Sequence, residues 1–497
     1  MIETGGWLPV SILATSGLVG IVIFFLDEPR HRTRNFLNIF AALAKIVLVA
    51  IAIGGYVEGE EYEARFAFVL EFDLLLRVDA VSLLFAGLSS VLWLLTTIYA
   101  IGYLEDSPHR SRFFGFFSIC VTATMGIAFA GNLITFVLFY ELLTIATYPL
   151  VVHRGSEEAL AAGRTYLIYT LGGGTALLVG VVWLHTIAGP IEFGPGGVLE
   201  QAASGNSWEL RVIFAVLIGS LGVKAALVPL HGWLPVAMVA PAPVSALLHA
   251  VAVVKAGAFG IVRVVHYVYG SDFADSLNLL LPLAIIASIT IVFGSLRALA
   301  QDDIKRRLAF STVSQLSYIT LGVAIVGPIA AVGALVHLVH QGVMKVTLFF
   351  CAGNLAETLG IHNVSELDGV ARRMPVTMTA FTIGGLGMIG LPPIAGFISK
   401  WHLGLGAMEA DFAWVIVILA TSSLLNAAYF FPPIYAAWFK TPQVEYPPAP
   451  GRLETSWMLL VPAAATALMS FLAGALAGVP YSPLDIAELV AEVVYPP

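Results

Sequence analysis

The segment LGVKAALVPLHGWLP at residues 221–235 decides how this chain is folded. Its lysine, Lys224, follows a run of apolar residues long enough to cross a bilayer, where an ionisable side chain is tolerated only if it is paired, hydrated or used. Pro229 and Pro235 interrupt a helix because proline lacks the amide hydrogen and its ring clashes with the preceding turn, and Gly232 can accommodate the turn. The segment therefore predicts a membrane helix that breaks just after a buried lysine.

The composition is that of a membrane protein. Hydrophobic residues make up 59% of the 497 residues and charged residues only 11%, and the mean hydropathy is +0.90, far from the balance of a soluble domain. The net charge of −8 argues against nucleic-acid binding. No nucleotide-binding glycine loop, nucleophile triad or metal cluster occurs, so ATP hydrolysis and covalent catalysis are not supported. Cys120 and Cys351 lie far apart in apolar stretches, which predicts inert packing residues.

Fourteen apolar windows are long enough to cross about 30 Å of hydrocarbon. The first window has no basic segment before it and no convincing cleavage site, so we expect a retained helix rather than a signal peptide. The windows lie at 7–26, 36–56, 80–104, 112–130, 132–152, 163–188, 210–230, 243–269, 277–299, 308–327, 329–352, 376–406, 412–438 and 456–478.

Basic residues are unevenly distributed over the connections between these windows. If the N-terminus is outside, the outside connections carry only Arg65, Arg77 and Arg211. The positive-inside rule then predicts a multi-pass protein of the cell (inner, cytoplasmic) membrane with both termini outside. The inside connections carry Arg30, Arg32, Arg34, Arg110, Arg112, Arg154, Arg164, Arg297, Lys305, Arg306, Arg307, Arg372, Arg373, Lys440 and Arg452.

A second interrupted helix occurs late in the chain. In GLPPIAGFISK at 390–400, Pro392 and Pro393 break the twelfth window, and Lys400 follows about two turns later. For each break alone the alternative is a proline kink beside a snorkelling lysine, but recurrence five windows apart favours repeated transporter units with sites near the bilayer midplane. We therefore expect an all-α polytopic membrane protein with two inverted five-helix repeats and broken helices 7 and 12. The expected divisions are 1–110 for spans 1–3, 111–270 for the first repeat, 271–440 for the second repeat and 441–497 for the last helix and tail.

Glu141 is the one carboxylate that these windows place deep in a span. A lone buried carboxylate is driven towards its neutral form, so Glu141 needs a cation nearby. Lys224 is the nearest candidate in chain order and at comparable depth. A pair of this kind that opens and closes can drive a proton.

Further titratable residues lie in the eighth and eleventh windows. Lys255 follows His249 by six residues on one helix, about 9 Å along the axis, and water could link the two side chains. A histidine in an apolar helix is usually a packing residue, but the neighbouring lysine favours a relay role. His337 and His340 share a helix face, with Lys345 a turn beyond. Metal binding is disfavoured because no carboxylate or cysteine completes a site.

Two other basic residues inside the windows receive different interpretations. Arg263 lies near the end of its helix, so we expect it to snorkel to the interface as an anchor. Lys45 lies near the centre of the second span with no obvious partner, which predicts a structural or interface role. Together with the acidic stretch EGEEYE at 58–63, Lys45 is a candidate contact at a subunit boundary; the alternatives are an internal polar contact and a solvated loop.

The run KAALVPLHGWLPVAMVAPAPVSALLHAVAVVKAG at 224–257, followed by DDIKRRLAFSTVSQ at 302–315, resembles the antiporter-like subunits shared by Mrp cation/proton antiporters, respiratory complex I and membrane-bound hydrogenases. This resemblance implies fourteen transmembrane helices with helices 7 and 12 broken. It also implies that a glutamate on helix 5 pairs with a lysine on helix 7, and that protons pass through a lysine on helix 8 to a charged residue on helix 12. These roles fall on Glu141, Lys224, Lys255 and Lys400.

Within this family, lysine on helix 12, the compact length and the short Gly-Asn connection at 131–132 are most similar to the D-type subunits of the Mrp Na⁺/H⁺ antiporters. The resemblance then implies a secondary ion transporter without cofactors, which moves protons and works with Na⁺ and with subunits of the A, B, C, E, F and G types. The alternatives are a membrane-arm subunit of complex I or of a hydrogenase, and a purely structural subunit. A stand-alone substrate transporter is disfavoured because no polar cluster suggests a cavity for an organic ligand. A Na⁺ site is expected in another subunit or at an interface, because Glu141 is committed to Lys224.

Overall fold

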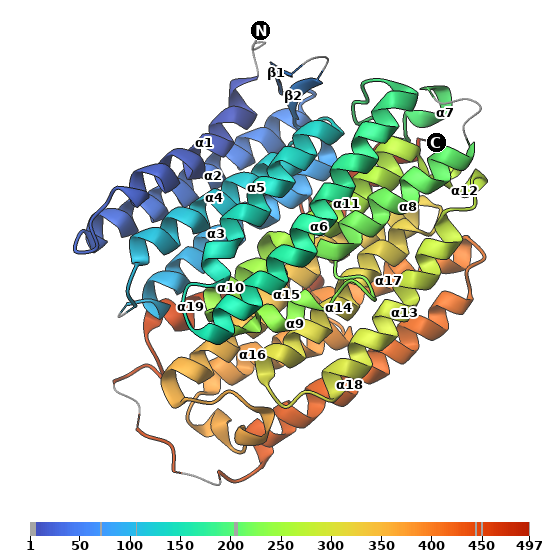
Figure 1. Ribbon diagram of the computed structural model, residues 1–497. Coiled ribbons are helices and arrows are strands. Elements are labelled where there is room, and N and C mark those ends of the chain that lie inside the picture. Colours follow the sequence, from blue (N-terminus) through green and yellow to red (C-terminus); the bar gives the residue numbers. More distant parts are fainter. Residues whose placement is uncertain are drawn as a thin grey trace.

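The computed structural model describes residues 6–69, 72–105, 107–202, 207–442, 445–448 and 451–496, and within these residues the chain is almost entirely helical (Figure 1). Long helices run side by side in one bundle, as the apolar windows predict. The uninterrupted long helices are α1 (Trp7–Phe24), α2 (His31–Val57), α3 (Ala80–Tyr103), α4 (Arg110–Ala128), α5 (Leu133–Val151), α6 (Glu157–Ala188), α13 (Leu280–Leu299), α14 (Ile304–Val323), α15 (Pro328–Leu359), α18 (Trp414–Phe439) and α19 (Trp457–Ala475).

Every predicted window contains a helix, so the all-α polytopic fold is confirmed. Eleven spans in the described residues are long and apolar enough to cross a membrane. The other three predicted windows correspond to α14, whose many polar residues lower its hydropathy, and to the two interrupted helices. The eighth window is a single buried span at 242–269, which combines α10 (Ala242–Ala246), the π-helical segment η2 (Leu247–Val251), α11 (Val253–Val262) and the π-helical segment η3 (Arg263–Tyr269).

The first interruption falls where the prolines predicted it. Helix α8 (Ser207–Lys224) ends at the lysine itself, and the chain turns through residues 225–232 before the short helix α9 (Trp233–Val236) begins. A break in hydrocarbon is tolerated only if the freed backbone groups find partners inside the protein. The indole of Trp233 donates to the carbonyl of Val223 at 2.7 Å, and the amide of Val228 donates to the hydroxyl of Thr290 at 3.1 Å.

The second interruption separates α16 (Pro375–Ile389) from α17 (Ala395–Glu409). Gly390 ends α16 with φ +93°, a conformation that glycine adopts without strain. The last carbonyl groups of α16 point at Lys400 on α17, so the negative end of one half-helix faces the lysine of the other. Both breaks therefore expose backbone carbonyls close to a lysine.

Two elements were not predicted. A β-hairpin of β1 (Glu63–Val69) and β2 (Phe72–Arg77) lies between α2 and α3, where the sequence analysis expected only a loop. The chain also ends in an amphipathic helix, α20 (Pro483–Val494), which packs against α15 and α3. The remaining short helices are α7 (Leu199–Ala202), α12 (Ser271–Ser276), η1 (Ala237–Val239), η4 (Val364–Glu366) and η5 (Val370–Arg372).

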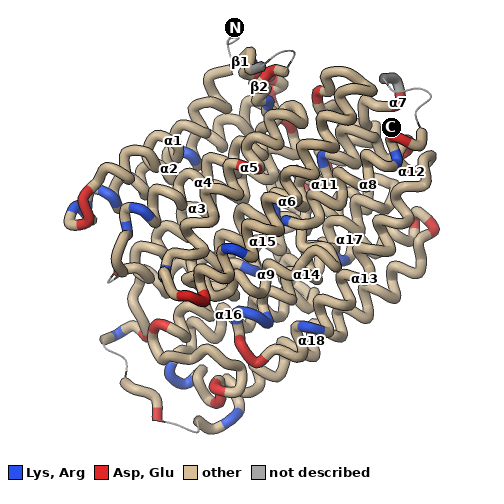
Figure 2. The backbone as a smooth tube through the Cα atoms, in the orientation of Figure 1, with Lys and Arg blue, Asp and Glu red and all other residues tan. Residues whose placement is uncertain are grey.

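Charged residues are concentrated at the two ends of the bundle (Figure 2). Few lysine or arginine positions lie along the helices between those ends, and they include the residues that the sequence analysis singled out. This separation positions a small set of charges in an apolar interior.

Candidate proton-relay site

Tyr140, the neighbour of Glu141 on α5, contacts Lys224 at the end of α8. The Lys224 ammonium donates to the main-chain carbonyl of Tyr140 at 2.5 Å and lies 3.3 Å from the centre of its ring. The Glu141 carboxylate lies directly against Gly174 on α6, where a Cβ atom would clash with it. Its Oε1 atom is buried without a hydrogen-bond partner in the protein.

The expected direct ion pair between Glu141 and Lys224 is absent from the described residues. The physical reason is that Lys224 is held by the Tyr140 carbonyl and ring, while the carboxylate of the next residue turns towards α6. The two groups are neighbours in an open arrangement. The two charges act on each other across the gap, which a bridging water can span.

The eighth span carries its titratable residues around a local change of helix type. His249 lies in the π-helical segment η2, and Lys255 lies in the first turn of α11. Single-turn π segments inside α-helices occur frequently at functional sites. The His249 ring lies 4.7 Å from the Phe349 ring, centre to centre and tilted by 35°, and neither of its ring nitrogens has a protein partner. The side chains of His249 and Lys255 are both fully buried.

Lys255 connects the eighth span to α15. Its ammonium donates to the carbonyl of Leu338 at 2.6 Å, one residue after His337 and two before His340. His340 is fully buried and has no protein partner on either ring nitrogen. His337 is held at both nitrogens, by the hydroxyl of Ser399 at 2.8 Å and by the carbonyl of Gln315 at 3.1 Å.

Lys400 is the next residue after Ser399 on α17. The Lys400 ammonium donates to the carbonyls of Met388 at 3.0 Å and Ile389 at 2.9 Å, and to the hydroxyl of Ser423 at 3.1 Å. These carbonyls are free because α16 ends there. The broken helix therefore supplies the acceptors for the lysine.

Sequence reasoning missed a polar network that reaches the same carbonyl from another direction. Lys345 donates to Ser311 at 2.6 Å, and Ser311 lies 2.9 Å from the hydroxyl of Tyr429. Tyr429 donates to Asn426 Oδ1 at 2.6 Å, and Asn426 Nδ2 donates to the Met388 carbonyl at 3.0 Å. The one signal in the sequence is Asn426, the single amide side chain in the window 412–438.

Several buried polar atoms on the helices that carry the relay residues, and on α14, which packs against α15, have no hydrogen-bond partner in the described part of the protein. Buried polar groups in proteins nearly always have a hydrogen-bond partner, which is often an ordered water. These atoms would therefore accommodate waters between the titratable side chains. They belong to Tyr140, Glu141, His249, Gln315, Tyr318, Thr320, His340 and Gln341.

The structure corrects what was expected of the two other basic residues. Arg263 does not snorkel: it is 1% exposed, and it makes a two-point ion pair with Asp79, the N-cap of α3, at 2.5 and 3.0 Å. Lys45 does not lie at a subunit boundary, because its side chain is fully buried within this chain and donates to Ser16 at 2.7 Å. Of the roles considered for Lys45, the structure supports the internal polar contact.

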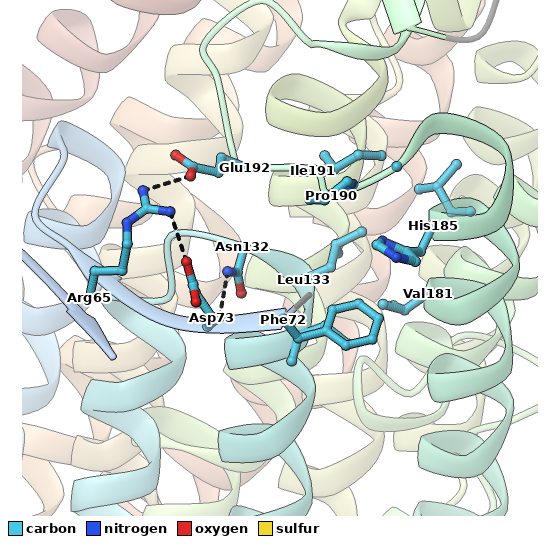
Figure 3. A pocket seen from close by; sticks show the side chains of 13 residues that line it. Arg65, Phe72, Asp73, Asn132, Leu133, Val181, His185, Pro190, Ile191 and Glu192 are labelled. Carbon is cyan, nitrogen blue, oxygen red and sulfur yellow. Dashed lines mark hydrogen bonds and ion pairs between the residues drawn. The ribbon is translucent and has the colours of Figure 1, made fainter. Parts of the chain in front are cut away.

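A cavity of about 60 Å³ lies at the end of α5 and α6 beside the β-hairpin (Figure 3). Glu192 lines one side of it and accepts hydrogen bonds of 2.6 Å from both Arg65 and Arg77. On the other side, the His185 ring lies 4.4 Å from the Phe72 ring, tilted by 44°. Burial raises the pKa of Glu192, but hydrogen bonds from the two arginines outweigh this and hold the pKa below its usual range. An ion-paired cluster therefore closes this end of α5, the helix that carries Glu141.

The fold is that of a polytopic membrane protein that carries lysines in its interior. A family model described as NADH:quinone oxidoreductase/Mrp antiporter, TM, matches residues 130–426. A second, described as NADH-Ubiquinone oxidoreductase (complex I), chain 5 N-terminus, matches residues 68–114. The chain therefore belongs to the family of proton-translocating membrane subunits shared by complex I and Mrp antiporters, as the sequence resemblance predicted.

Relatives from both branches of this family cover most of the chain. The NADH-quinone oxidoreductase subunit N of Desulforudis audaxviator is 36% identical, over 86% of this chain and 88% of its own length. The D-type subunit of the Na(+)/H(+) antiporter of Bacillus subtilis is 26% identical, over 92% of this chain and 91% of its own. A chain of the Mrp complex from Dietzia sp. DQ12-45-1b has the same fold, with a TM-score of 0.85, 21% identity and coverage of 100% of this chain and 98% of its own.

Proposed function

We propose that this chain moves protons across the membrane through Glu141, Lys224, Lys255 and Lys400, with His249, His337, His340 and Lys345 as accessory members of the relay. One observation carries the proposal: Lys255 donates to the Leu338 carbonyl beside His337, and His337 in turn contacts Ser399, the neighbour of Lys400. Lys224, Lys255 and Lys400, on three different spans, each donate to helix carbonyls in the buried interior. A buried charge of this kind is expensive unless it has a function.

The mechanism follows from electrostatics at low dielectric. Closing the open arrangement of Glu141 and Lys224 stabilises the protonated lysine, and opening it releases that proton. Water passes the proton to His249 and Lys255, the histidines of α15 carry it onward, and the C-terminal carbonyls of α16 stabilise it on Lys400. Each proton that arrives on one lysine repels the proton on the next lysine and drives it further along the relay.

The ion that is exchanged for protons depends on which branch of the family the chain represents. We propose an Mrp-type antiporter subunit, which exchanges protons for a monovalent cation, Na⁺ first, together with subunits of the A, B, C, E, F and G types in the cell membrane. Lysine rather than glutamate at position 400 and the match to a D-type antiporter subunit over 92% of this chain support this proposal. The Na⁺ site is then formed by another subunit or at an interface.

A second candidate is a proton-pumping subunit of a quinone-linked oxidoreductase. One observation favours it: the identity to the N-type subunit of such an enzyme, 36%, exceeds the 26% identity to the D-type antiporter subunit. The buried relay is the same in both candidates. They differ in what drives it.

The test is to purify the native complex in a mild detergent and to measure its subunits, iron and flavin. Small hydrophobic partners without iron or flavin, with proton flux driven by a sodium gradient in proteoliposomes, support the antiporter. Iron–sulphur and flavin partners, with flux driven by a redox substrate, overturn that choice in favour of the second candidate. Full proton flux in an assembled Lys224→Ala complex would overturn the relay itself.

A further inference from the structure

A second line of buried polar side chains runs through the N-terminal helices, apart from the relay. It begins at Glu28, whose carboxylate accepts hydrogen bonds from the first amides of α4, those of Arg110 at 3.1 Å and Ser111 at 3.0 Å. Arg34 on α2 is 1% exposed, lies 3.6 Å from Glu28 and donates to the Ser111 hydroxyl at 2.9 Å. This end of the line lies at the surface of the bundle, because the Glu28 side chain is 43% exposed.

The line continues inward between α2, α4 and α1. Asn38 donates to the Arg34 carbonyl at 3.0 Å and accepts from Ser118 at 3.3 Å. One turn further along α4, Thr122 donates to the Ser118 carbonyl at 3.0 Å and lies 2.8 Å from the hydroxyl of Ser16 on α1. Each contact is a polar step towards the bilayer centre.

The line ends at Lys45. Its ammonium donates to Ser16 at 2.7 Å and lies 4.9 Å from the centre of the Trp93 ring. Lys45 is eleven residues beyond Arg34 on the same helix, which places it roughly 16 Å deeper, about half the thickness of the hydrocarbon core. A buried ammonium held by one hydroxyl and one aromatic ring has two further N–H donors to satisfy.

The described helices that pack against α2 supply no carboxylate to form an ion pair with Lys45. Helices α1, α3 and α4, which the structure describes in full, carry no carboxylate and pack on α2. An unpaired buried cation is strongly unfavourable, so a purely structural lysine would be an unfavourable choice at this position. The titratable or charged side chains of these three helices are Tyr99, Tyr103, Cys120, Arg110 and Arg112, and α2 itself adds His31, Arg32, Arg34 and Tyr56.

A second observation points to water at the same place. Trp93 Nε1, Thr96 Oγ1 and Thr97 Oγ1 are fully buried on one face of α3 and have no partner in the protein. Residues spaced by three and four share a helix face, and this face includes the ring that contacts Lys45. Buried hydroxyls and N–H groups of this kind are the usual hosts of internal water.

We propose that Lys45 is a proton-binding site, reached by water along this polar line from the membrane face that carries Glu28 and Arg34. The ligand is a proton delivered as hydronium. The line stops at Lys45, because the next buried residues of α2, Val49 and Ala52, are apolar. The site is therefore a half-channel that opens to one side only, and it does not depend on the relay of the proposed function.

Thiol accessibility tests the water path without any transport assay. In full-length protein with Cys120→Ala and Cys351→Ala, Ser16→Cys and Thr97→Cys leave Lys45 unsubstituted and introduce little change in volume. We expect a membrane-impermeant cationic methanethiosulfonate, added from the face of Arg34, to modify both on the order of tenfold faster than Val49→Cys, because the thiolate reacts only where water reaches it. Val49 is the matched control, since its side chain is 2% exposed on the same helix as Lys45. Equal rates at all three positions, or equal rates from both faces, would overturn the path.

Proton binding needs a separate readout. The fluorescence contributed by Trp93, taken as the difference between the protein and Trp93→Phe, should change with pH and lose that change in Lys45→Met. A difference signal that is flat across the pH range in which the fold is stable, or one that persists in Lys45→Met, would contradict proton binding at Lys45. Loss of flux in a relay mutant such as Lys224→Ala leaves both readouts unchanged, so the two proposals fail independently.

Discussion

Lys255 on α11 donates a hydrogen bond of 2.6 Å to the carbonyl of Leu338 on α15, and this contact joins the two halves of the proposed relay. On one side of Lys255 lie His249 and the Lys224 region, and on the other lie His337, Ser399 and Lys400. The bond crosses between spans that are far apart in sequence. The proposed relay therefore passes from the first broken helix to the second through Lys255.

We expect Lys255→Met to lower proton flux by about 10²-fold or more, the range typical of a positioned proton-transfer group. The apolar methionine is close in length, so the complex should still assemble. Proton flux in proteoliposomes, measured with a pH-sensitive dye, checks this. Lys440→Met, which removes a half-exposed lysine at the end of α18, is the control and should retain flux. Unchanged flux in Lys255→Met would remove this residue from the path.

Gly174 on α6 leaves the space that the Glu141 carboxylate occupies. A methyl group at Gly174 would clash with that carboxylate, so we expect Gly174→Ala to displace Glu141 and to reduce flux nearly as far as Glu141→Gln. Gly172→Ala is the matched control, because nothing lies within 4 Å of its would-be Cβ and alanine is the better helix former by about 1 kcal/mol. Equal flux in the two alanine variants would mean that the position of Glu141 is unimportant.

Tyr429 connects Ser311 to Asn426 in the network that begins at Lys345. Tyr429→Phe keeps the ring and removes the hydroxyl that bonds both partners. If protons reach Lys400 through this network, the variant lowers flux and shifts its pH dependence, while unfolding temperature changes little. Tyr435→Phe, at an exposed position on the same helix, should leave flux and pH dependence unchanged. A pH profile identical to that of the parent protein would assign Tyr429 to packing alone.

The sequence predicted the spans and the charged members of the site for a physical reason. Apolar length is a local property, and an ionisable residue in such a window stands out because it is unfavourable there. The breaks at Pro229 and Pro392 were equally local. The features that the sequence did not predict depend on contacts between distant segments. The network of Ser311, Tyr429 and Asn426 is one of them, because single polar residues of these types do not stand out in a membrane helix as charged residues do.

Arg263 is a second case in which a contact with a distant segment could not be predicted from the local sequence. Its position near the end of a predicted span suggested a side chain that reaches the interface, but its partner, Asp79, lies 184 residues earlier in the chain. The local sequence of the eighth span contains no sign of that carboxylate. The direct contact expected between Glu141 and Lys224 failed similarly, because the competing Tyr140 carbonyl and the space at Gly174 are properties of the packed helices.

The pair of Arg263 and Asp79 yields a prediction about stability. Asp79→Asn retains a side chain that can cap α3 but removes the charge opposite a guanidinium that is 1% exposed. Breaking a buried pair by removing one partner typically destabilises by about 3–5 kcal/mol, because the remaining charge is left uncompensated. We therefore expect a marked fall in unfolding temperature in detergent for Asp79→Asn. Asp27→Asn, which removes the partner of the exposed Arg30, should change stability by no more than about 1 kcal/mol. The double variant Asp79→Asn with Arg263→Met should recover much of the loss, since it removes the uncompensated charge. A double variant no more stable than Asp79→Asn would show that the loss does not come from an uncompensated guanidinium.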